Sequence, residues 1–184
     1  MATVEAEQRW RQMDSSFPDG FVELFHEHFP RLFRYVDRLS GDPDLASDLV
    51  QEAFLRLYAR GAPPDKPAAW LITVATNLFR NARAKATRRA RLLSTVRGAD
   101  LLADPAPSPS DTTESLELQR CVRRTIDALP ERDRCLLLLR AEGYGYREIA
   151  AALELNEASV GTLLARAKRA FRDLYHEDAD APGR

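Results

Sequence analysis

Cysteine and long apolar runs are scarce in this sequence. Among its 184 residues, Cys121 and Cys135 are the only cysteines, too far apart for a CxxC pair and too few for a zinc site. We expect two ordinary thiols in a reducing compartment. The longest apolar run, 135–139, is far shorter than the roughly 20 residues that cross a bilayer. The acidic first 20 residues lack the apolar segment of a secretory signal. We therefore expect a soluble, cytoplasmic protein without membrane insertion.

Sequence patterns typical of an active site are also missing. The chain shows no glycine-rich phosphate loop, no metal-ligand cluster and no nucleophile–base pair. We therefore expect no enzymatic activity, no catalytic residue, no bound metal and no cofactor. Hydrophobic residues make up 45% of the chain and charged residues 30%, which is typical of a chain that folds.

Acidic residues are absent from one long stretch, although the formal net charge of the whole chain is only -1. Residues 66–99 contain no acidic residue. The basic residues in this stretch are Lys66, Arg80, Arg83, Lys85, Arg88, Arg89, Arg91 and Arg97. The next segment, 100–114, has the opposite bias, with the acids Asp100, Asp104, Asp111 and Glu114. Such segregation favours a local contact between the basic stretch and a polyanion. A solvated helix face is the alternative interpretation.

Helical periodicity dominates both ends of the chain. Apolar residues recur three and four positions apart from 21 to 39, from 45 to 58 and from 68 to 93, and breakers occupy 40–43 and 61–67. The stretch 103–113 is rich in Pro, Ser and Thr and reads as an extended linker. The predicted fold is all-α, with two small helical domains joined by a flexible linker. The sequence leaves open whether the two halves pack together.

Two faces of the predicted N-terminal helices have a chemistry of their own. Asn and Arg side chains recur along one face of the helix from 68, next to Trp70, and such side chains can contact bases and phosphates. Asp44, Asp48 and Glu52 lie four residues apart on the preceding helix. This acidic row is interpreted as a partner-docking surface or a solvated face; catalysis is disfavoured because no histidine or cysteine accompanies it.

The C-terminal half is predicted to contain a helix-turn-helix. A helix begins near Pro130 and runs towards Gly143, and two more follow from Tyr146 and from Glu157. The small Ala150 permits close helix packing, and Asn156 is placed to cap the last helix. The internal contacts are expected from Ile149, Ala150, Leu153, Leu155, Val160 and Leu163. An ordinary helical hairpin is the alternative.

Both halves together resemble the extracytoplasmic-function group of bacterial sigma factors, in the sigma-seventy family. The matching text is DLASDLVQEAFLRL at 44–57 and PAAWLITVATN at 67–77, then LPERDR at 129–134 and YREIA at 146–150 with the helix that follows. The resemblance implies a promoter-specificity subunit of RNA polymerase. It divides the chain into an N-terminal extension (1–19), sigma region 2 (20–93), an acidic linker (94–114), sigma region 4 (115–175) and a tail (176–184).

The resemblance also implies roles for particular residues. The surface that docks on the clamp helices of core RNA polymerase is expected to comprise Asp48, Leu49, Gln51, Glu52, Phe54 and Leu55. Contacts that read and melt the minus-ten element are expected from Lys66, Trp70, Thr73, Asn77, Arg80, Asn81, Lys85, Arg88 and Arg89. The minus-thirty-five element is expected to meet Arg147, Asn156, Glu157, Ala158, Ser159, Thr162, Arg166, Lys168 and Arg169, while region 4 rests on the polymerase flap. An anti-sigma factor is a further expected partner.

The chain departs from the family pattern at four positions. Glu154 replaces a turn glycine, which predicts a different turn, and Asn81 stands where Asp is common. Gly161 and Leu163 replace basic residues on the DNA-facing helix, which affects the expected minus-thirty-five contact. Two other hypotheses remain: a free-standing helix-turn-helix regulator, for which no dimerising helix or ligand pocket is evident, and a protein-binding adaptor, which leaves the basic stretch unexplained.

Overall fold

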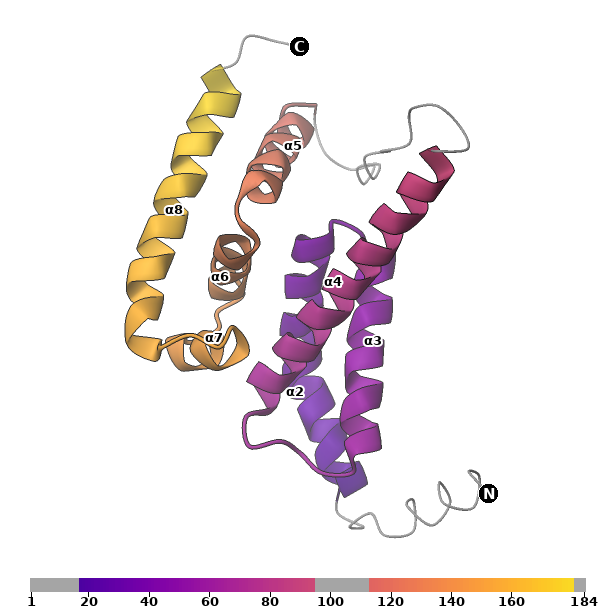
Figure 1. The fold of residues 1–184 in the computed structure, drawn as a ribbon. Coiled ribbons are helices and arrows are strands. Elements are labelled where there is room, and N and C mark those ends of the chain that lie inside the picture. Colours follow the sequence, from indigo (N-terminus) through magenta and orange to yellow (C-terminus); the bar gives the residue numbers. More distant parts are fainter. Residues whose placement is uncertain (1–16, 95–112, 181–184) are drawn as a thin grey trace.

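The structure, a computed structural model, describes residues 17–94 and 113–180. Within these ranges the chain forms seven helices and no strands: α2 (Phe17–Ser40), α3 (Pro43–Arg60), α4 (Pro67–Ser94), α5 (Thr113–Ala128), α6 (Glu131–Ala141), α7 (Tyr146–Ala152) and α8 (Glu157–Asp180) (Figure 1). The all-α prediction is confirmed. The expected N-terminal extension and linker lie largely outside the described residues. No helix in the described part is long and apolar enough to cross a membrane.

The first three helices, α2, α3 and α4, pack against one another as a bundle. Local signals fix the ends of α3. The side chain of Asp42 accepts hydrogen bonds from the backbone N–H groups of Asp44 and Leu45, both at 3.0 Å, and Pro43 occupies the first turn. At the other end Gly61 adopts a left-handed conformation with φ 75° and stops the helix.

In the C-terminal half, the long helix α8 contacts each of the other three helices, α5, α6 and α7. The expected single helix between Pro130 and Gly143 is present as α6, and Pro130 is its N-cap residue. A short loop containing Glu142, Gly143 and Tyr144 joins α6 to α7. The sequence did not single out this loop, although it lies at the centre of the molecule.

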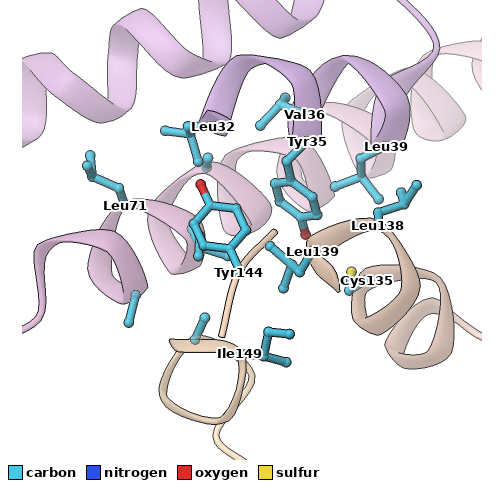
Figure 2. Packing of buried hydrophobic residues seen from close by; sticks show 14 of the residues in the cluster. Leu32, Tyr35, Val36, Leu39, Leu71, Cys135, Leu138, Leu139, Tyr144 and Ile149 are labelled. Atoms are coloured by element: carbon cyan, nitrogen blue, oxygen red, sulfur yellow. The ribbon is translucent and has the colours of Figure 1, made fainter. Parts of the chain in front are cut away.

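One hydrophobic core extends through both halves of the chain. Helix α6 packs on α2 and helix α7 on α4, and Figure 2 shows side chains from both halves meeting at this seam. Tyr144 is 1% exposed and belongs to the same buried cluster as Leu32 and Leu71 of the N-terminal half. Cys135 and Leu139 of α6 join Tyr35 of α2 in that cluster. The question that the sequence left open is thus answered: the halves are packed together.

Polar contacts also join the halves at the end of α2. The guanidinium of Arg123, on α5, donates hydrogen bonds to the backbone carbonyls of Arg38 at 2.8 Å and Ser40 at 3.0 Å. These carbonyls have no partner inside the helix because they belong to its last turn. Gly41 makes the approach possible, since a Cβ there would lie 2.7 Å from the Arg123 guanidinium carbon. Its φ of +70° also favours glycine.

Candidate functional site

The acidic row on α3 lies at the surface. Asp44, Asp48 and Gln51 are exposed, and the Glu52 carboxylate accepts a hydrogen bond from Arg56 at 2.9 Å. Leu55, on the same helix, is 63% exposed. The result is a negative surface with one apolar side chain in it, and such charges can steer a positively charged partner.

Two residues assigned to this surface by resemblance lie beneath it. Leu49 is 8% exposed and Phe54 3% exposed, and both belong to the core cluster. The Phe54 ring is packed at a centroid distance of 4.9 Å from Phe25 and 6.2 Å from Phe21. These two side chains hold α3 against α2. The outward surface therefore consists of Asp48, Gln51, Glu52 and Leu55.

The N-terminal half of α4, as far as Arg80, contacts the C-terminal half of the protein. The Thr73 hydroxyl lies 2.9 Å from the carbonyl of Ala69 and 3.1 Å from that of Ala152 on α7. Arg80 forms an ion pair with Glu131 of α6 and also donates to the Asn77 side chain at 3.1 Å. The hydrogen bond with Glu131 is the main cause of the raised pKa of Arg80. Trp70, in the first turn of α4, is half-buried.

The later turns of α4 are open to solvent and strongly basic. In Figure 1 this end of the helix projects beyond α2 and α3. The exposed predicted contacts there are Asn81, Lys85, Arg88 and Arg89, and Lys66 is exposed before the helix begins. An exposed, projecting basic helix can approach a phosphate backbone without displacing other parts of the protein.

The helix-turn-helix is formed by α7, the turn 153–156 and α8. Ile149 and Val160 are fully buried between the helices, and the Asn156 side chain accepts a hydrogen bond from the Ala158 N–H at 3.0 Å, which confirms the expected cap. The expectation of a different turn at Glu154 is wrong: its φ of 55° is the left-handed conformation that glycine usually adopts. A hydrogen bond of 2.8 Å from the Leu155 N–H to the Ala150 carbonyl closes this turn.

The outer face of this motif carries the predicted DNA-reading residues. Ser159 is half-buried and its hydroxyl donates to the Asn156 carbonyl at 2.8 Å. The other members of the predicted set are exposed: Arg147, Asn156, Glu157, Ala158, Thr162, Arg166, Lys168 and Arg169. The face is thus polar and basic towards its C-terminal part, with no element of the described chain covering it.

A large groove that the sequence analysis missed lies between α5, α6, α8 and the end of α2. Its volume is about 1750 Å³. Apolar side chains such as Leu116, Leu137 and Phe171 line it, and Arg38, Arg120, Lys168 and Arg172 are among its basic residues. The apolar positions of α5 were the signal that could have revealed it, because that helix has apolar residues beyond those that pack in the core.

The structure also brings together residues that the sequence analysis did not connect. The Glu142 carboxylate lies between Arg34 and Arg38 of α2, with nitrogen–oxygen distances of 2.7 and 2.9 Å. The guanidinium of Arg31 lies 4.0 Å from the centre of the Tyr144 ring. Burial raises the pKa of Tyr144 to about 12, so its hydroxyl stays protonated. In the described residues no group of His, Cys, Asp and Glu is arranged to hold a metal ion.

Two family models match the chain, one in each half. Sigma-70 region 2 matches residues 24–89, which comprise most of the three-helix bundle, and sigma-70 region 4 matches residues 119–171, from α5 into α8. The order of the two regions along the chain is that of the resemblance described above.

Curated proteins with similar sequences are RNA polymerase sigma factors. The chain is 32% identical to sigma factor CarQ of Myxococcus xanthus, over 85% of this chain and 87% of that protein. It is 36% identical to the ECF sigma factor EcfG of Rhodopseudomonas palustris, over 79% of this chain and 77% of that protein. The ECF sigma factor SigE of Mycolicibacterium smegmatis is 31% identical; that match takes in 87% of this chain and 63% of the longer relative.

Solved structures show the same fold. The sigma factor CnrH, solved with the cytosolic domain of CnrY, superposes with a TM-score of 0.62 at 23% identity, covering 97% of each chain. The sigma factor RpoE of Bartonella quintana, solved with the anti-sigma factor NepR, gives a TM-score of 0.58 at 21% identity, covering 89% of this chain and 98% of that one. Sequence, order of regions and fold agree, and the chain belongs to the extracytoplasmic-function (ECF) RNA polymerase sigma factors of the sigma-70 family.

Proposed function

We propose that this protein binds core RNA polymerase and directs it to specific promoters by contacting the minus-ten and minus-thirty-five elements. The observation that carries the proposal is the presence of both sigma regions in one chain, each with an exposed surface suited to its role. The protein has no active site of its own in this scheme, because the polymerase supplies the chemistry. It acts in the cytoplasm, with the polymerase.

Core polymerase is held through the outward surface of α3. Asp48 and Glu52 provide the negative charge and Leu55 the apolar contact for the clamp helices. Leu49 and Phe54, which are buried, position the helix from beneath. Charged side chains around an exposed apolar residue are suited to fast and specific docking, since they steer encounter and fix register.

Promoter DNA is contacted at two places. The basic face of α4 binds the minus-ten element, with Arg88 and Arg89 at the phosphates and Asn77 and Asn81 at the bases of the separated strand, while Trp70 supports an unstacked base. The exposed face of α8 enters the major groove at the minus-thirty-five element. Thr162 and Arg166 lie on that face. The predicted bounds 20–93 and 115–175 are retained as the two functional regions.

The groove between α5, α6 and α8 is suited to the polymerase flap. It has an apolar lining and basic residues, and it belongs to the half that rests on the flap in the resemblance. An anti-sigma factor is the second protein partner that we propose. Support comes from the two similar structures, because RpoE was solved with the anti-sigma factor NepR and CnrH was solved with CnrY.

Charge reversal on α3 tests the proposal. We expect the double variant Asp48→Arg/Glu52→Arg to lose binding to bacterial core polymerase in a pull-down, because both side chains reach solvent and neither supports the core. The matched control is Asp173→Arg/Glu177→Arg, an exposed acidic pair with the same spacing on α8. The control should bind polymerase as the unaltered protein does.

Transcription on a library of genomic fragments completes the test. Polymerase with the unaltered protein should start at discrete new promoters, and the α3 variant should not support them. Equal polymerase binding by both double variants would contradict the role of α3. Failure of the unaltered protein to bind polymerase, with retained affinity for duplex DNA, would favour the free-standing regulator.

A further inference from the structure

Gly161 leaves an open position on the face of α8 that is proposed to read DNA. Ala158 lies three residues before it, and Thr162 lies four residues after Ala158, so the three positions share one face of the helix. Ala158 and Thr162 are both exposed there. Because glycine has no side chain, α8 itself offers nothing at this point to contact a base or a phosphate.

The ring of Tyr146, the first residue of α7, lies against this open position. A Cβ atom at Gly161 would lie 3.6 Å from the ring carbon Cε2 of Tyr146 and 4.0 Å from its hydroxyl oxygen. The first turn of α7 is fixed, because the Glu148 carboxylate accepts a hydrogen bond of 2.7 Å from the Gly145 N–H. Tyr146 therefore reaches from the start of α7 to the reading face of α8.

Much of the Tyr146 side chain stays open to a ligand. Tyr146 is 45% exposed, and in the described part of the chain it is the one aromatic residue among the exposed large apolar residues. The guanidinium of Arg140 lies 5.7 Å from the centre of the ring, within the range of a cation–π contact. Arg140 is itself held by a hydrogen bond of 3.2 Å to the Tyr144 carbonyl. A ring with these neighbours loses little conformational freedom when it binds.

The place of this ring in the motif indicates what it would meet. In a helix-turn-helix the first helix crosses the DNA backbone and the second enters the major groove. The motif lies at one end of the C-terminal half (Figure 1), and a side chain that reaches from α7 to the reading face of α8 lies at the edge of that groove. The ring has no charge and offers an apolar surface. In the major groove the matching apolar group is the 5-methyl group of thymine, whereas an arginine would favour guanine.

We propose that Tyr146 is a specificity-determining residue of the minus-thirty-five contact, where its ring contacts the methyl group of a thymine. This inference rests on the proposed function, because it requires the outer face of α7 and α8 to meet that element. Gly161 is the condition for the contact, since a long side chain at this position would occupy the place of the ring. The chain thus uses an uncharged aromatic ring where basic residues are common in the family.

Removal of single methyl groups from the DNA tests the proposal. Selection from a randomised duplex library with the full chain identifies the preferred element, and each thymine in it is then replaced by uracil. Uracil at one position should weaken binding by the unaltered protein about fourfold, as expected for the loss of one buried methyl group. Tyr146→Ala should bind the two duplexes equally, and Tyr146→Phe, which keeps the ring, should retain the difference. Fluorescence anisotropy measures these affinities.

The matched variants separate a DNA contact from a structural role. Gly161→Arg should lose the uracil effect and select guanine at that position. Gly20→Arg adds the same charge on α2, where no atom lies within 4 Å of a new Cβ, and should keep the uracil effect. Tyr175→Ala, which removes a half-buried tyrosine near the far end of α8, should keep it too. If Tyr146 only packed α7 on α8, Tyr146→Ala would weaken binding to both duplexes and leave their ratio unchanged.

The proposal would be overturned if no thymine showed a uracil effect with the unaltered protein, or if the effect persisted in Tyr146→Ala. Selection of no preferred sequence would also overturn it. Should Tyr146→Ala fail to fold, as shown by its circular dichroism, Gly161→Arg decides, and persistence of the effect there would contradict the contact. None of these measurements requires polymerase. If the unaltered protein failed to bind polymerase, the proposed function would fail while the uracil comparison still judged Tyr146.

Discussion

Glu154 adopts a left-handed backbone conformation that costs a residue with a side chain roughly 1–2 kcal/mol. We expect Glu154→Gly to stabilise the protein by up to about 1 kcal/mol, because glycine adopts this conformation freely but loses more entropy on folding. Glu154→Val, with a β-branched side chain, should destabilise it. Urea unfolding measures both. A Gly variant less stable than the unaltered protein would mean that the glutamate side chain contributes more than the strain costs.

His28 is a buried residue with a pH-dependent contribution to stability. Burial is the main cause of its lowered pKa; Arg31 acts in the same direction, and Glu27 and Glu148 oppose it. The unfolded chain therefore binds a proton at this histidine at a higher pH than the folded chain does. The contribution of the neutral His28 to the stability of the fold is fully present above the ordinary histidine pKa of about 6.5. This contribution is lost as the pH falls below that value.

Thermal unfolding between pH 7.5 and 6 checks this prediction. The melting temperature of the unaltered protein should decrease as the pH is lowered. The His28→Asn variant should show a smaller decrease over the same pH range. The control is His26→Asn, which alters an exposed histidine on the same helix and should retain the full pH dependence. Identical pH profiles for all three proteins would exclude His28 as the titrating group.

Single residues show where the sequence was informative. The cap at Asn156 was predicted because capping depends on side chains within a few positions. Leu49 and Phe54 were assigned to the docking surface, because a family motif records positions and does not distinguish outward residues from those beneath them. Glu142 escaped notice because its partner Arg34 lies 108 residues away in the sequence. No local pattern links them.

Helix α4 is the element whose two ends have different surroundings. We expect Arg88→Ala/Arg89→Ala to weaken promoter opening, because both side chains are exposed on the projecting basic turns. We also expect a change in the salt dependence, measured as the slope of log affinity for single-stranded DNA against log salt concentration. This slope should become shallower by about 1.4, because each phosphate neutralised by an Arg or Lys side chain contributes about 0.7 to its magnitude. Filter binding across a salt series measures this slope.

The control for α4 removes the same charge elsewhere. Arg60 and Arg132 are exposed on α3 and α6, and Arg60→Ala/Arg132→Ala should leave the salt slope close to that of the unaltered protein. If the two double variants gave equal slopes, the basic turns of α4 would not be the site of phosphate binding.

At the scale of elements the sequence was a good guide. The ends of α3 and the start of α4 follow from Asp42, Gly61 and the prolines between 63 and 67, whose conformational effects are local. The first helix begins at Phe17, earlier than the periodic residues from Phe21 indicated. The groove beside α5 was missed, since a groove is defined by neighbours that only the tertiary fold brings together.

At the scale of the whole molecule, the described helices share one buried core that includes residues of both halves, and this affects how the protein unfolds. Both tryptophans, Trp10 and Trp70, belong to the N-terminal half, so intrinsic fluorescence reports on that half, whereas far-ultraviolet circular dichroism reports on all helices. We expect the two signals to change together in urea, in a single transition. A second transition seen only by circular dichroism would show that the halves unfold independently.

Packing between the halves is the part of the architecture that sequence patterns did not predict. Each half has the composition of a small helical domain, and the composition of the linker, residues 103–113, favours two halves that do not pack together. The seam includes Tyr144, Glu142, Arg31, Arg34 and Arg38. Their contacts depend on the mutual placement of distant segments, which periodicity and capping do not encode.

The packing of Tyr144 and Glu142 against α2 and α4 has a consequence for building hybrid sigma factors for orthogonal gene circuits. Region 4 is the part to exchange when recognition of a different minus-thirty-five element is wanted. In this protein the exchanged part also carries one side of the contact between the two halves. A donor region 4 without matching residues at these two positions would leave a hydrophobic hollow and uncompensated arginines on the recipient. Functional hybrids will therefore need substitutions in α2 of the recipient that match the donor region 4.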